Sequence, residues 1–563
     1  MKLRHFKINS EFRGLPKGFS LQFRQHNEYA GDNEEPICMV GLNGSGKSNS
    51  LEVLSELFYY LELQTLATDK TLEDVNKEYQ FLDFELTYEI SSLKWKSAFS
   101  KYRQTPEISA ESKVLVNCTK KKNDNLNITV ADIEKSGSRF SVPNYLWREI
   151  LPNKVVGYSS GQNELISNPF IKLDYYYFDE FVKSTSDQNI ATNTEVNRMF
   201  FMDYESNELI VLANYLFEDF GKARGNEKSD VNVKVAIEQL HSFSLKIQFR
   251  TYDGNGIEFP SELNLGIEKL KQCATTWTDN KPQIKTKRER VITLSFYVDI
   301  AVRTAFRNVF KTSYELFRLL YLLRLMNIHS ISPTTRKKIR EATHGTNLSD
   351  LIPRPEQDKL LFKVNDIRFR KKNVKSPVWY KQLSDGEHQL LHVMGTLKMM
   401  RENDVLFLLD EPETHFNPEW RAKMIRLIME TNKEEGLEQD HFITSHSPFI
   451  ISDCKPTNVY LFHRKNGKLQ LPVQTAHDRR LNTFGTSVNL LTDEVFNKNE
   501  SQGEYSGITI KELMDRDYQT LEAIEKAKID ARILGDSVEK TLLFRKLIMI
   551  EDELTKKEKR KKK

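Results

Sequence analysis

The order of apolar and polar residues divides the chain into a strand-rich beginning, a helix-rich middle and a mixed end. Segments 3–12, 19–26 and 79–90 alternate apolar and polar positions, which is typical of half-buried strands. A short apolar run, Ile37 to Val40, precedes a glycine-rich loop. Beyond the loop, one face of an amphipathic helix is indicated by apolar residues at helical spacing: Leu51, Leu54, Phe58 and Leu61. The pattern therefore predicts a buried strand, a loop and a helix in succession.

The pattern becomes helical from about Asn168 to Lys371, where segments such as 206–219 and 303–327 are separated by polar loops. Helices and buried strands then alternate again, as expected of an α/β core. We expect four segments: 1–167 and 372–474 as two halves of one α/β core, 168–371 as an inserted, mainly helical domain, and 475–563 as a charged helical C-terminal region.

The glycine-rich loop GLNGSGKS, Gly41 to Ser48, has the composition of a phosphate-binding loop. Its glycines let backbone N–H groups point into a nest for phosphate oxygens, and the following helix adds the positive end of its dipole. Lys47 can reach the β- and γ-phosphates, and the Ser48 hydroxyl can ligate Mg²⁺. A glycine-rich turn with a chance lysine is the alternative, but the predicted strand and helix on either side favour nucleotide binding.

Two acidic residues end the apolar run Val405 to Leu409, which is typical of a strand buried on both faces of a parallel sheet. Ligands bind at the carboxyl ends of such strands. We expect Asp410 to hold Mg²⁺ through water and Glu411 to orient or deprotonate the attacking water. An acidic pair after a strand is more often a turn; the phosphate loop in the same chain favours the functional interpretation.

Two further motifs place polar residues where they can contact a γ-phosphate. Ser384 and Glu387 form a capping box that predicts a helix start in QLSDGEHQLL, where Ser384 and the Gly386 amide can contact a γ-phosphate. In HFITSHSPFI a strand ends at Ser445, and His446 is expected beside Asp410 as a γ-phosphate sensor. A capped helix and a structural histidine are the plainer alternatives.

Composition excludes several other classes. Hydrophobic residues make up 39% of the chain and charged residues 29%, and no stretch approaches the roughly 20 apolar residues of a membrane span. The start of the chain lacks an apolar signal segment, so we expect an intracellular, cytoplasmic protein. Four scattered cysteines argue against a zinc site or disulfide framework. The net charge of +4 is small and does not by itself imply a nucleic-acid partner. The basic tail 556–563 is interpreted as a solvated helix end rather than a phosphate-binding arm.

These four motifs, in this order, resemble the ABC-type ATPases, particularly the SMC, RecF and OLD-like branch. The resemblance implies an α/β ABC-type P-loop core, ATP and Mg²⁺ as cofactors, and two chains paired head to tail so that the signature motif of one covers ATP on the other. VVGYSSGQNEL resembles the Q-loop, which makes Gln162 a contact for Mg²⁺ and water. The signature reads LSDGE where transporters usually have LSGGQ, and Asn417 stands where many relatives carry the D-loop aspartate.

The candidate site residues follow from the motifs and this resemblance together. The catalytic candidates are Glu411 and His446, and the Mg²⁺ ligands are Ser48, Gln162 and Asp410. The residues expected to bind ATP are Asn43, Gly44, Ser45, Gly46, Lys47, Ser48, Gln162, Ser384, Gly386 and Glu387.

Three further segments bear on the family: EFRGLPKGF, TFGTSVNLL and LGDSVEK. With them, the chain resembles more narrowly the restriction-system-associated AAA ATPases of bacterial anti-phage defence. This group includes the PtuA subunits of Septu systems and of retrons. The resemblance implies a sensor and scaffold subunit that controls a separate HNH nuclease, PtuB, in some systems beside a reverse transcriptase and retron DNA. The segment NVYLFHRKNGKLQL that follows the His446 motif contains no DxD of the kind OLD nucleases carry, so no intrinsic nuclease is expected. The alternatives are a RecF- or SMC-like DNA-repair or DNA-end-binding ATPase, with nucleic-acid contact, and a transporter subunit, which would need a membrane partner.

Overall fold

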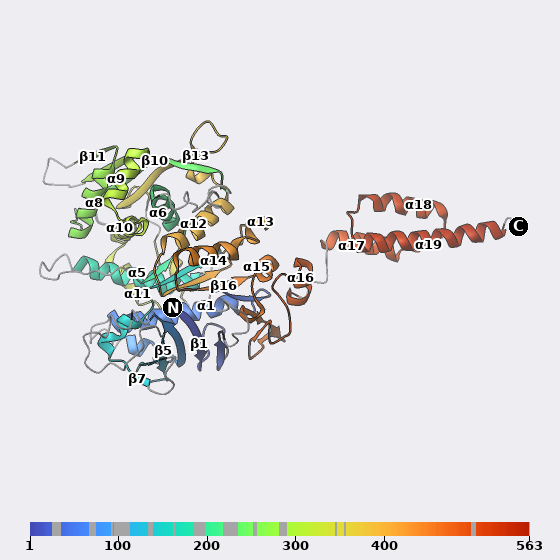
Figure 1. The fold of residues 1–563 in the computed structure, drawn as a ribbon, viewed down its shortest axis with the longest axis horizontal. Coiled ribbons are helices and arrows are strands. Elements are labelled where there is room, and N and C mark those ends of the chain that lie inside the picture. The colour runs from blue at the N-terminus through green and yellow to red at the C-terminus, as the bar shows by residue number, and fades with distance from the viewer. Residues whose placement is uncertain are drawn as a thin grey trace. The chain divides into compact units, whose positions relative to one another are not determined.

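The computed structural model forms two compact units, Met1–Thr486 and Ser487–Lys563 (Figure 1). The residues described are 1–24, 35–66, 75–91, 94, 113–132, 139–161, 164–183, 198–217, 235–250, 256–280, 290–343, 346–353, 356–496 and 503–561.

A seven-stranded sheet in the order β20-β17-β3-β16-β15-β8-β9 forms the centre of the first unit. Every neighbouring pair is parallel except β17 with β20. Strands β3 and β15 are buried along their whole length, as expected of central parallel strands. The strands are β3 (Ile37–Gly41), β8 (Lys154–Ser159), β9 (Met199–Phe201), β15 (Val405–Asp410), β16 (Gln439–Ser445), β17 (Val459–Phe462) and β20 (Gln474–Thr475). The predicted α/β core is confirmed, and β9 extends it beyond residue 167.

Helix α1 (Lys47–Leu66) follows the glycine loop and is buried almost all round rather than on one face. It contacts strands of the parallel sheet and belongs to a hydrophobic cluster that also contains the first antiparallel sheet. Two of its buried acids have polar partners. Arg13 and the Tyr79 hydroxyl contact Glu56 at 3.1 and 2.6 Å, and Tyr177 donates to Glu62 at 2.8 Å. The apolar residues at helical spacing predicted the helix, but they did not predict that its other side is buried as well.

The first antiparallel sheet has six strands in the order β2-β1-β4-β5-β6-β7. They are β1 (Lys2–Ile8), β2 (Phe19–Gln22), β4 (Phe84–Ile90), β5 (Val114–Lys120), β6 (Asn127–Asp132) and β7 (Arg139–Ser141). The strand predicted over 79–90 begins only at Phe84, because Tyr79 lies in a turn that directs its hydroxyl to Glu56.

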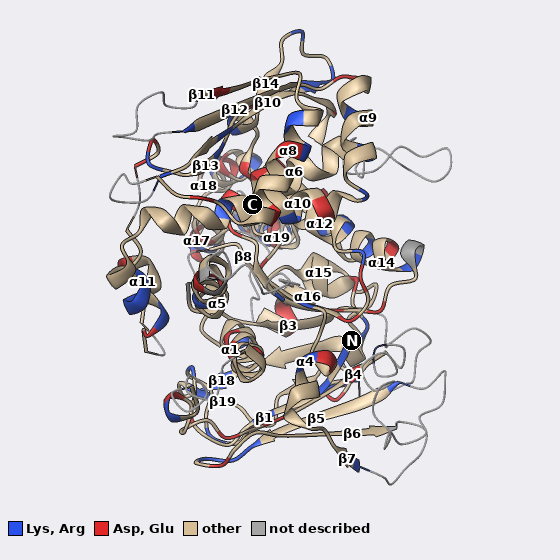
Figure 2. Cartoon of the chain, turned by 90° about the vertical axis from the view of Figure 1, so that its left-hand side faces the viewer, with Lys and Arg blue, Asp and Glu red and all other residues tan. Residues whose placement is uncertain are grey.

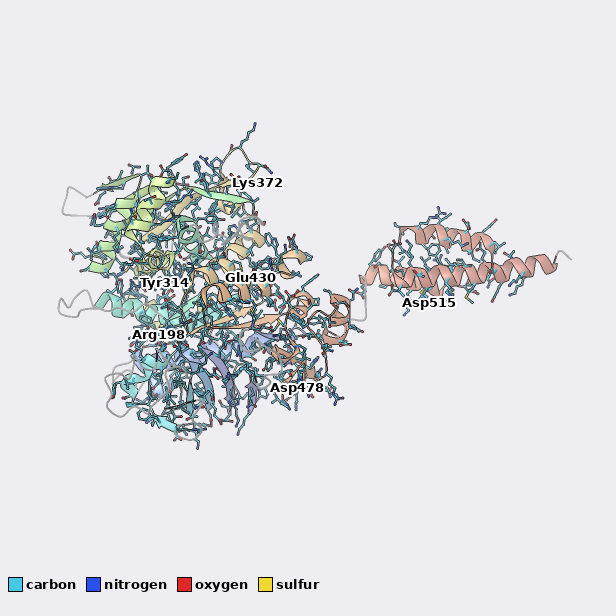
Figure 3. All side chains as sticks on the ribbon, in the orientation of Figure 1. Arg198, Tyr314, Lys372, Glu430, Asp478 and Asp515 are labelled. Atoms are coloured by element: carbon cyan, nitrogen blue, oxygen red, sulfur yellow. The ribbon has the colours of Figure 1, made fainter. Side chains whose placement is uncertain are left out.

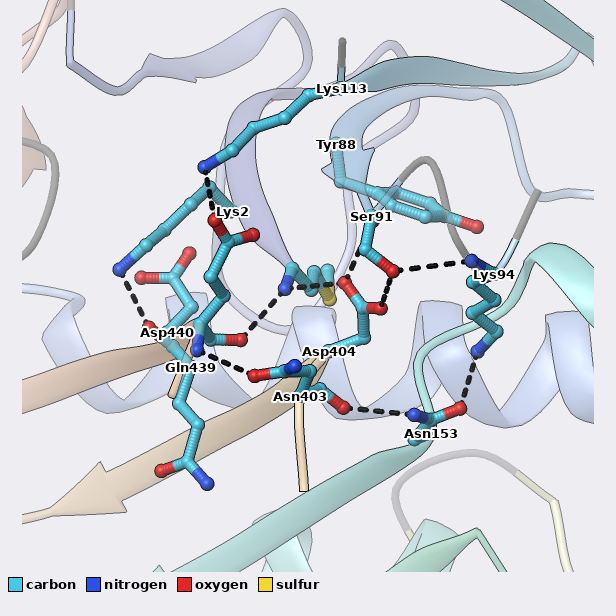
Figure 4. Close-up of polar contacts among 12 residues, drawn as sticks. Lys2, Tyr88, Ser91, Lys94, Lys113, Asn153, Asn403, Asp404, Gln439 and Asp440 are labelled. Carbon is cyan, nitrogen blue, oxygen red and sulfur yellow. Dashed lines mark hydrogen bonds and ion pairs between the residues drawn. The ribbon is translucent and has the colours of Figure 1, made fainter. Parts of the chain in front are cut away.

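Polar contacts fix this antiparallel sheet to the amino ends of β15 and β16 (Figure 4). The fully buried Arg24 and Asp440 form an ion pair at 2.5 Å, and Leu3 N donates to Asp440 at 2.7 Å. Lys2 Nζ donates to Gln439 O at 2.6 Å, and the Ser91 hydroxyl donates to Asp404 at 2.9 Å. These contacts hold one edge of the parallel sheet and leave its carboxyl edge to the candidate site.

Residues past α5 (Glu164–Lys183) form a mixed region in which helices pack against a five-stranded sheet of order β11-β12-β10-β13-β14. The sequence patterns predicted its helices but not this sheet. Its strands are β10 (Ile237–Gln248), β11 (Thr276–Asn280), β12 (Val291–Tyr297), β13 (Phe362–Lys371) and β14 (Val378–Trp379). Its helices include α6 (Tyr204–Phe217), α8 (Ser261–Cys273), α9 (Ile300–Val309), α10 (Ser313–Leu325) and α11 (Pro333–Arg340). The helical segment 303–327 is two helices, because Thr312 caps α10 by accepting from Glu315 N.

The second unit is helical, as predicted, and contains α16 (Val488–Phe496), α17 (Glu504–Asp515), α18 (Leu521–Asp530) and α19 (Val538–Lys561). The last three share a small apolar core around Ile524, Leu543 and Leu547. None of the helices in the described ranges is long and apolar enough to cross a bilayer.

Candidate functional site

The glycine loop lies between β3 and α1, as the sequence predicts, at the carboxyl edge of the parallel sheet. Gly44 and Gly46 have φ of +70° and +108°, a left-handed conformation that glycine adopts without strain. The hydroxyl of Ser45 is buried and has no hydrogen-bond partner among the described residues. The loop therefore has the left-handed glycine backbone and the available donor that a phosphate-binding loop requires.

Asp410 ends β15 and lies directly against the start of α1. Its Oδ1 accepts from the Ser48 hydroxyl at 2.8 Å and from Thr444 Oγ1 at 2.6 Å. The Ser159 hydroxyl, at the end of β8, approaches Oδ2 at 3.4 Å. Three neighbouring strands and the loop helix thus bring hydroxyl and carboxylate oxygens together, and such oxygens are the ligands that Mg²⁺ prefers. Ser48 and Asp410 fit the predicted metal site.

Glu411 has φ of +48°, which is unfavourable for a residue with a side chain. Two hydrogen bonds hold it there, because its N–H donates to Thr444 O at 3.2 Å and to Thr444 Oγ1 at 3.1 Å. Backbone strain maintained by the surrounding structure is concentrated at functional positions. The turn directs the carboxylate of Glu411 toward His446, whose Nε2 lies 3.1 Å from Oε1.

The side chains of Lys47 and Glu411 both contact Nε2 of His446. Lys47 Nζ lies 2.9 Å from His446 Nε2 and donates to Gly41 O at 3.0 Å. Burial lowers the pKa of Lys47 to about 8, and the hydrogen bond with His446 holds the pKa of Glu411 below its usual value. His446 follows β16, which lies between β3 and β15, so the predicted placement of this histidine beside the strand of Asp410 is confirmed.

The signature motif begins α12 (Asp385–Met399). Ser384 is its N-cap, and the predicted capping box with Glu387 is present. Glu387 also pairs with Lys371 at 2.6 Å, and although burial would raise the pKa of Glu387, the bonds from Lys371 and Ser384 lower it. No hydrogen bond or ion pair between described residues joins Ser384, Gly386 or Glu387 to the loop at 41–48.

Gln162 lies outside the described residues. The strand before it, β8, ends with Ser159 beside Asp410 and is followed by Ser160, whose hydroxyl lies 2.9 Å from Thr414 Oγ1. Asn417, in place of the D-loop aspartate, caps the short helix α13 (Pro418–Arg421) by accepting from Trp420 N at 2.9 Å.

The sequence motifs did not indicate two buried polar residues beside the site, Glu413 and Gln389. Glu413 accepts from the Ser445 hydroxyl, which in turn accepts from Ser447 N at 2.9 Å, so the turn bearing His446 is fixed to the β15 loop. Gln389 of α12 donates to the Tyr158 hydroxyl at 2.8 Å and accepts from His415 N at 2.9 Å. A polar residue at a position that helical spacing predicts to be buried was the available signal for Gln389.

Glu413→Gln should remove a pH dependence of stability. Burial raises the pKa of Glu413 from 4.5 to about 7, so the folded chain holds a proton that the unfolded chain releases between these values. Stability from this group is therefore lost as pH rises from about 4.5 to 7. At pH 8 the variant should be more stable, by on the order of 3 kcal/mol, and near pH 4.5 it should match the parent chain. Thermal unfolding at both pH values tests this; equal stabilities at pH 8 would contradict it.

Gly386→Ala should separate the signature helix from the loop after β15. A Cβ at Gly386 would lie 2.7 Å from the carbonyl oxygen of His415, which is backbone and cannot move alone. We expect a loss of about 1 to 3 kcal/mol, measured by calorimetry. Gly507→Ala, within α17, is the matched control, because nothing lies within 4 Å of its Cβ position and helical alanine is favoured over glycine. A decrease for both variants, or for neither, would refute the steric account.

The second half of this site lies in a range that is similar to a known family model. Residues 303–452 match the model described as "AAA domain, putative AbiEii toxin, Type IV TA system", a range that includes the signature, β15 and His446. No curated protein matches the chain.

Similar solved structures include two SMC head domains and a recombination mediator protein. The SmcHead bound to the C-winged helix domain of ScpA is 9% identical with a TM-score of 0.33, over 85% of this chain and 100% of that one. The SMC head domain from Thermotoga maritima is 10% identical with a TM-score of 0.30, over 84% and 99%. The recombination mediator protein RecF-ATPrS in the RecFOR pathway is 14% identical with a TM-score of 0.27, over 83% and 97%.

Proposed function

We propose that the chain binds and hydrolyses ATP with Mg²⁺ at the carboxyl edge of its parallel sheet. The observation that carries this proposal is the convergence of Lys47, Ser48, Asp410, Glu411 and His446, which come from three separate sequence motifs. Bound ATP would supply the reactive phosphoanhydride, and Mg²⁺ would be held by Ser48 and Asp410, with Gln162 as a further ligand. Asn43, Gly44, Ser45 and Gly46 complete the loop around the phosphates.

Each of these residues has a separate role in hydrolysis. Lys47 neutralises phosphate charge, and Glu411, held as a carboxylate by His446, accepts a proton from the attacking water. His446 contacts both Lys47 and Glu411, so it can transmit the state of one to the other. Nothing in this arrangement of described residues provides chemistry on a second substrate.

The site also supports a head-to-tail dimer. Ser384, Gly386 and Glu387 begin a helix whose N-terminus can receive anionic phosphate oxygens, yet among the described residues they make no polar contact with the loop at 41–48 in their own chain. A second copy of the chain would bring them to the nucleotide. Mass photometry of the full chain should show dimers with ATP and Mg²⁺ and monomers without them. Binding of ATP with no change in mass would refute the dimer but leave the nucleotide site standing.

We further propose that this ATP-dependent assembly controls a separate HNH nuclease in an anti-phage defence complex, as the PtuA-like sequence segments suggest. In a retron system a reverse transcriptase and its DNA would be further partners. The test is purification of the full chain together with the products of its adjacent genes, with and without ATP. Recovery of an HNH protein supports the role, and recovery of the ATPase alone counts against it.

A further inference from the structure

The five-stranded sheet of the inserted region has one covered face and one open face. Helices α6, α8 and α9 lie along one side of it in both views (Figures 1 and 2). Apolar residues such as Leu245, Leu294 and Phe369 point to that side and are fully buried. Most residues that alternate with them along the strands are exposed or half-buried, and in both views no described helix of the unit Met1–Thr486 lies over this opposite face.

Strand register defines what the open face presents. One row across the sheet places Tyr297, Ser242, Arg368 and Trp379 side by side. The next row contains Thr276, Ser295, Ser244 and Asn365, and the third contains Thr278, Thr293, Lys246 and Lys363. We call these three rows, together with Arg370, which lies two residues beyond Arg368 on β13, the open face. They combine cations, small hydroxyl side chains and two aromatic rings.

The aromatic rings and the cations of the open face are in contact. The guanidinium of Arg368 lies 4.0 Å from the ring centroid of Trp379, which is 39% exposed. Tyr297 is 50% exposed and its hydroxyl accepts from Arg370 at 3.3 Å. Arg368 Nε is buried and has no hydrogen-bond partner among the described residues. The guanidinium is thus oriented by a ring while a donor on it remains unused.

The three rows of the open face contain no carboxylate of their own. The acidic residues of the five strands are Glu238, Asp279 and Asp366, and none of them belongs to the three rows. Asp279 pairs with Lys271 of α8 on the covered side. The turn between β13 and β14 adds Lys372, labelled in Figure 3, and Lys375, both exposed. Beyond the rows, Glu208 and Asp366 line a hollow of about 170 Å³ with Lys363 and Trp379, which limits the cationic surface on that edge.

We propose that the open face binds single-stranded nucleic acid, with phosphates on Lys246, Lys363, Arg368 and Arg370 and bases stacked on Trp379 and Tyr297. An uncovered, cation-bearing sheet is complementary to a polyanion. Exposed rings distinguish a single strand from a duplex, because only unpaired bases can leave their own stack to lie on them. This site is separate from the nucleotide site and does not depend on the proposed ATPase function.

The test is fluorescence anisotropy of the full chain with a labelled oligo(dT) of about 20 nucleotides and with a duplex of the same length. We expect the single strand to bind at least about tenfold more tightly than the duplex, since the rings reach only unpaired bases. Trp379→Ala should weaken single-strand binding roughly tenfold. Arg368→Gln with Arg370→Gln should weaken it and reduce the slope of log K against log salt by about 0.7 for each phosphate that is no longer neutralised.

Two control variants match these changes elsewhere on the molecule. Trp277→Ala removes a comparably exposed tryptophan, 48%, that also carries a cation, Lys271, at 4.7 Å, but points to the covered side. Lys337→Gln with Lys338→Gln removes two exposed charges from α11. Both controls, and Lys47→Ala, should bind the oligonucleotide as the parent chain does. Equal losses in the controls, equal binding of duplex, or binding of poly-glutamate but not of the oligonucleotide would overturn the proposal.

Discussion

Glu411→Gln should bind ATP with the affinity of the parent chain and hydrolyse it about a hundredfold or more slowly. A glutamine keeps the size of the side chain and one acceptor oxygen but cannot take a proton from water, and a positioned general base contributes about 10² to 10⁴ in rate. Affinity should be retained, because the phosphate contacts proposed here come from the loop at 41–48, and the backbone of residue 411 stays bonded to Thr444.

The same variant should accumulate the ATP-bound dimer, since the step that ends that state is blocked. Phosphate release measures hydrolysis, equilibrium dialysis measures affinity, and mass photometry measures the dimer. Glu430→Gln, an exposed glutamate of α14 (Met424–Glu435) labelled in Figure 3, is the control and should hydrolyse ATP normally. Hydrolysis by Glu411→Gln at the rate of the parent chain would show that another group is the base.

The local sequence predicted the residues around Asp410 and His446 well, because these motifs lie directly at the ends of central strands. The apolar run before Asp410 indicates a buried parallel strand. Its pairing in register with the strand before His446 places Asp410 and His446 at the same edge of the sheet. The capping box at Ser384 is likewise a short-range signal, complete within the span from Ser384 to Glu387. Such features need no knowledge of distant packing.

Features set by tertiary contacts could not be predicted in this way. The left-handed backbone at Glu411 depends on Thr444, 33 residues along the chain. The buried glutamates of α1 look like a polar face until Arg13, Tyr79 and Tyr177 are placed around them. The sheet of the inserted region is built from strands separated by helices and polar loops, so its alternating segments are too short and scattered to be recognised from periodicity alone.

Lys47→Ala should lose ATP binding almost completely, by on the order of a hundredfold or more in Kd. A buried, charge-assisted contact to phosphate is worth about 2 to 5 kcal/mol, and each 1.4 kcal/mol is about tenfold in affinity. Lys47→Met, which retains most of the aliphatic stem, should lose as much, since the ammonium is the group in contact with phosphate. Isothermal titration calorimetry measures both variants, and binding by either at the parent affinity would remove Lys47 from the site.

The loss should not come from unfolding. Because burial lowers the pKa of Lys47 to about 8, the folded chain binds fewer protons than the unfolded chain between pH 8 and 10.5, and the charged ammonium costs stability below pH 8. Lys47→Met should therefore melt no lower than the parent chain at about pH 7.

Because the pKa of Lys47 is lowered, ATP binding should be coupled to the uptake of protons. Phosphate favours the charged ammonium, so ATP binding at about pH 8.5 should take up protons and weaken as pH rises further. Titrations in two buffers of different ionisation enthalpy measure this uptake. Lys47→Met supplies the reference, because its residual binding should lack the uptake due to this side chain. Equal proton uptake in the parent chain and the variant would contradict a direct contact between Lys47 and the phosphates.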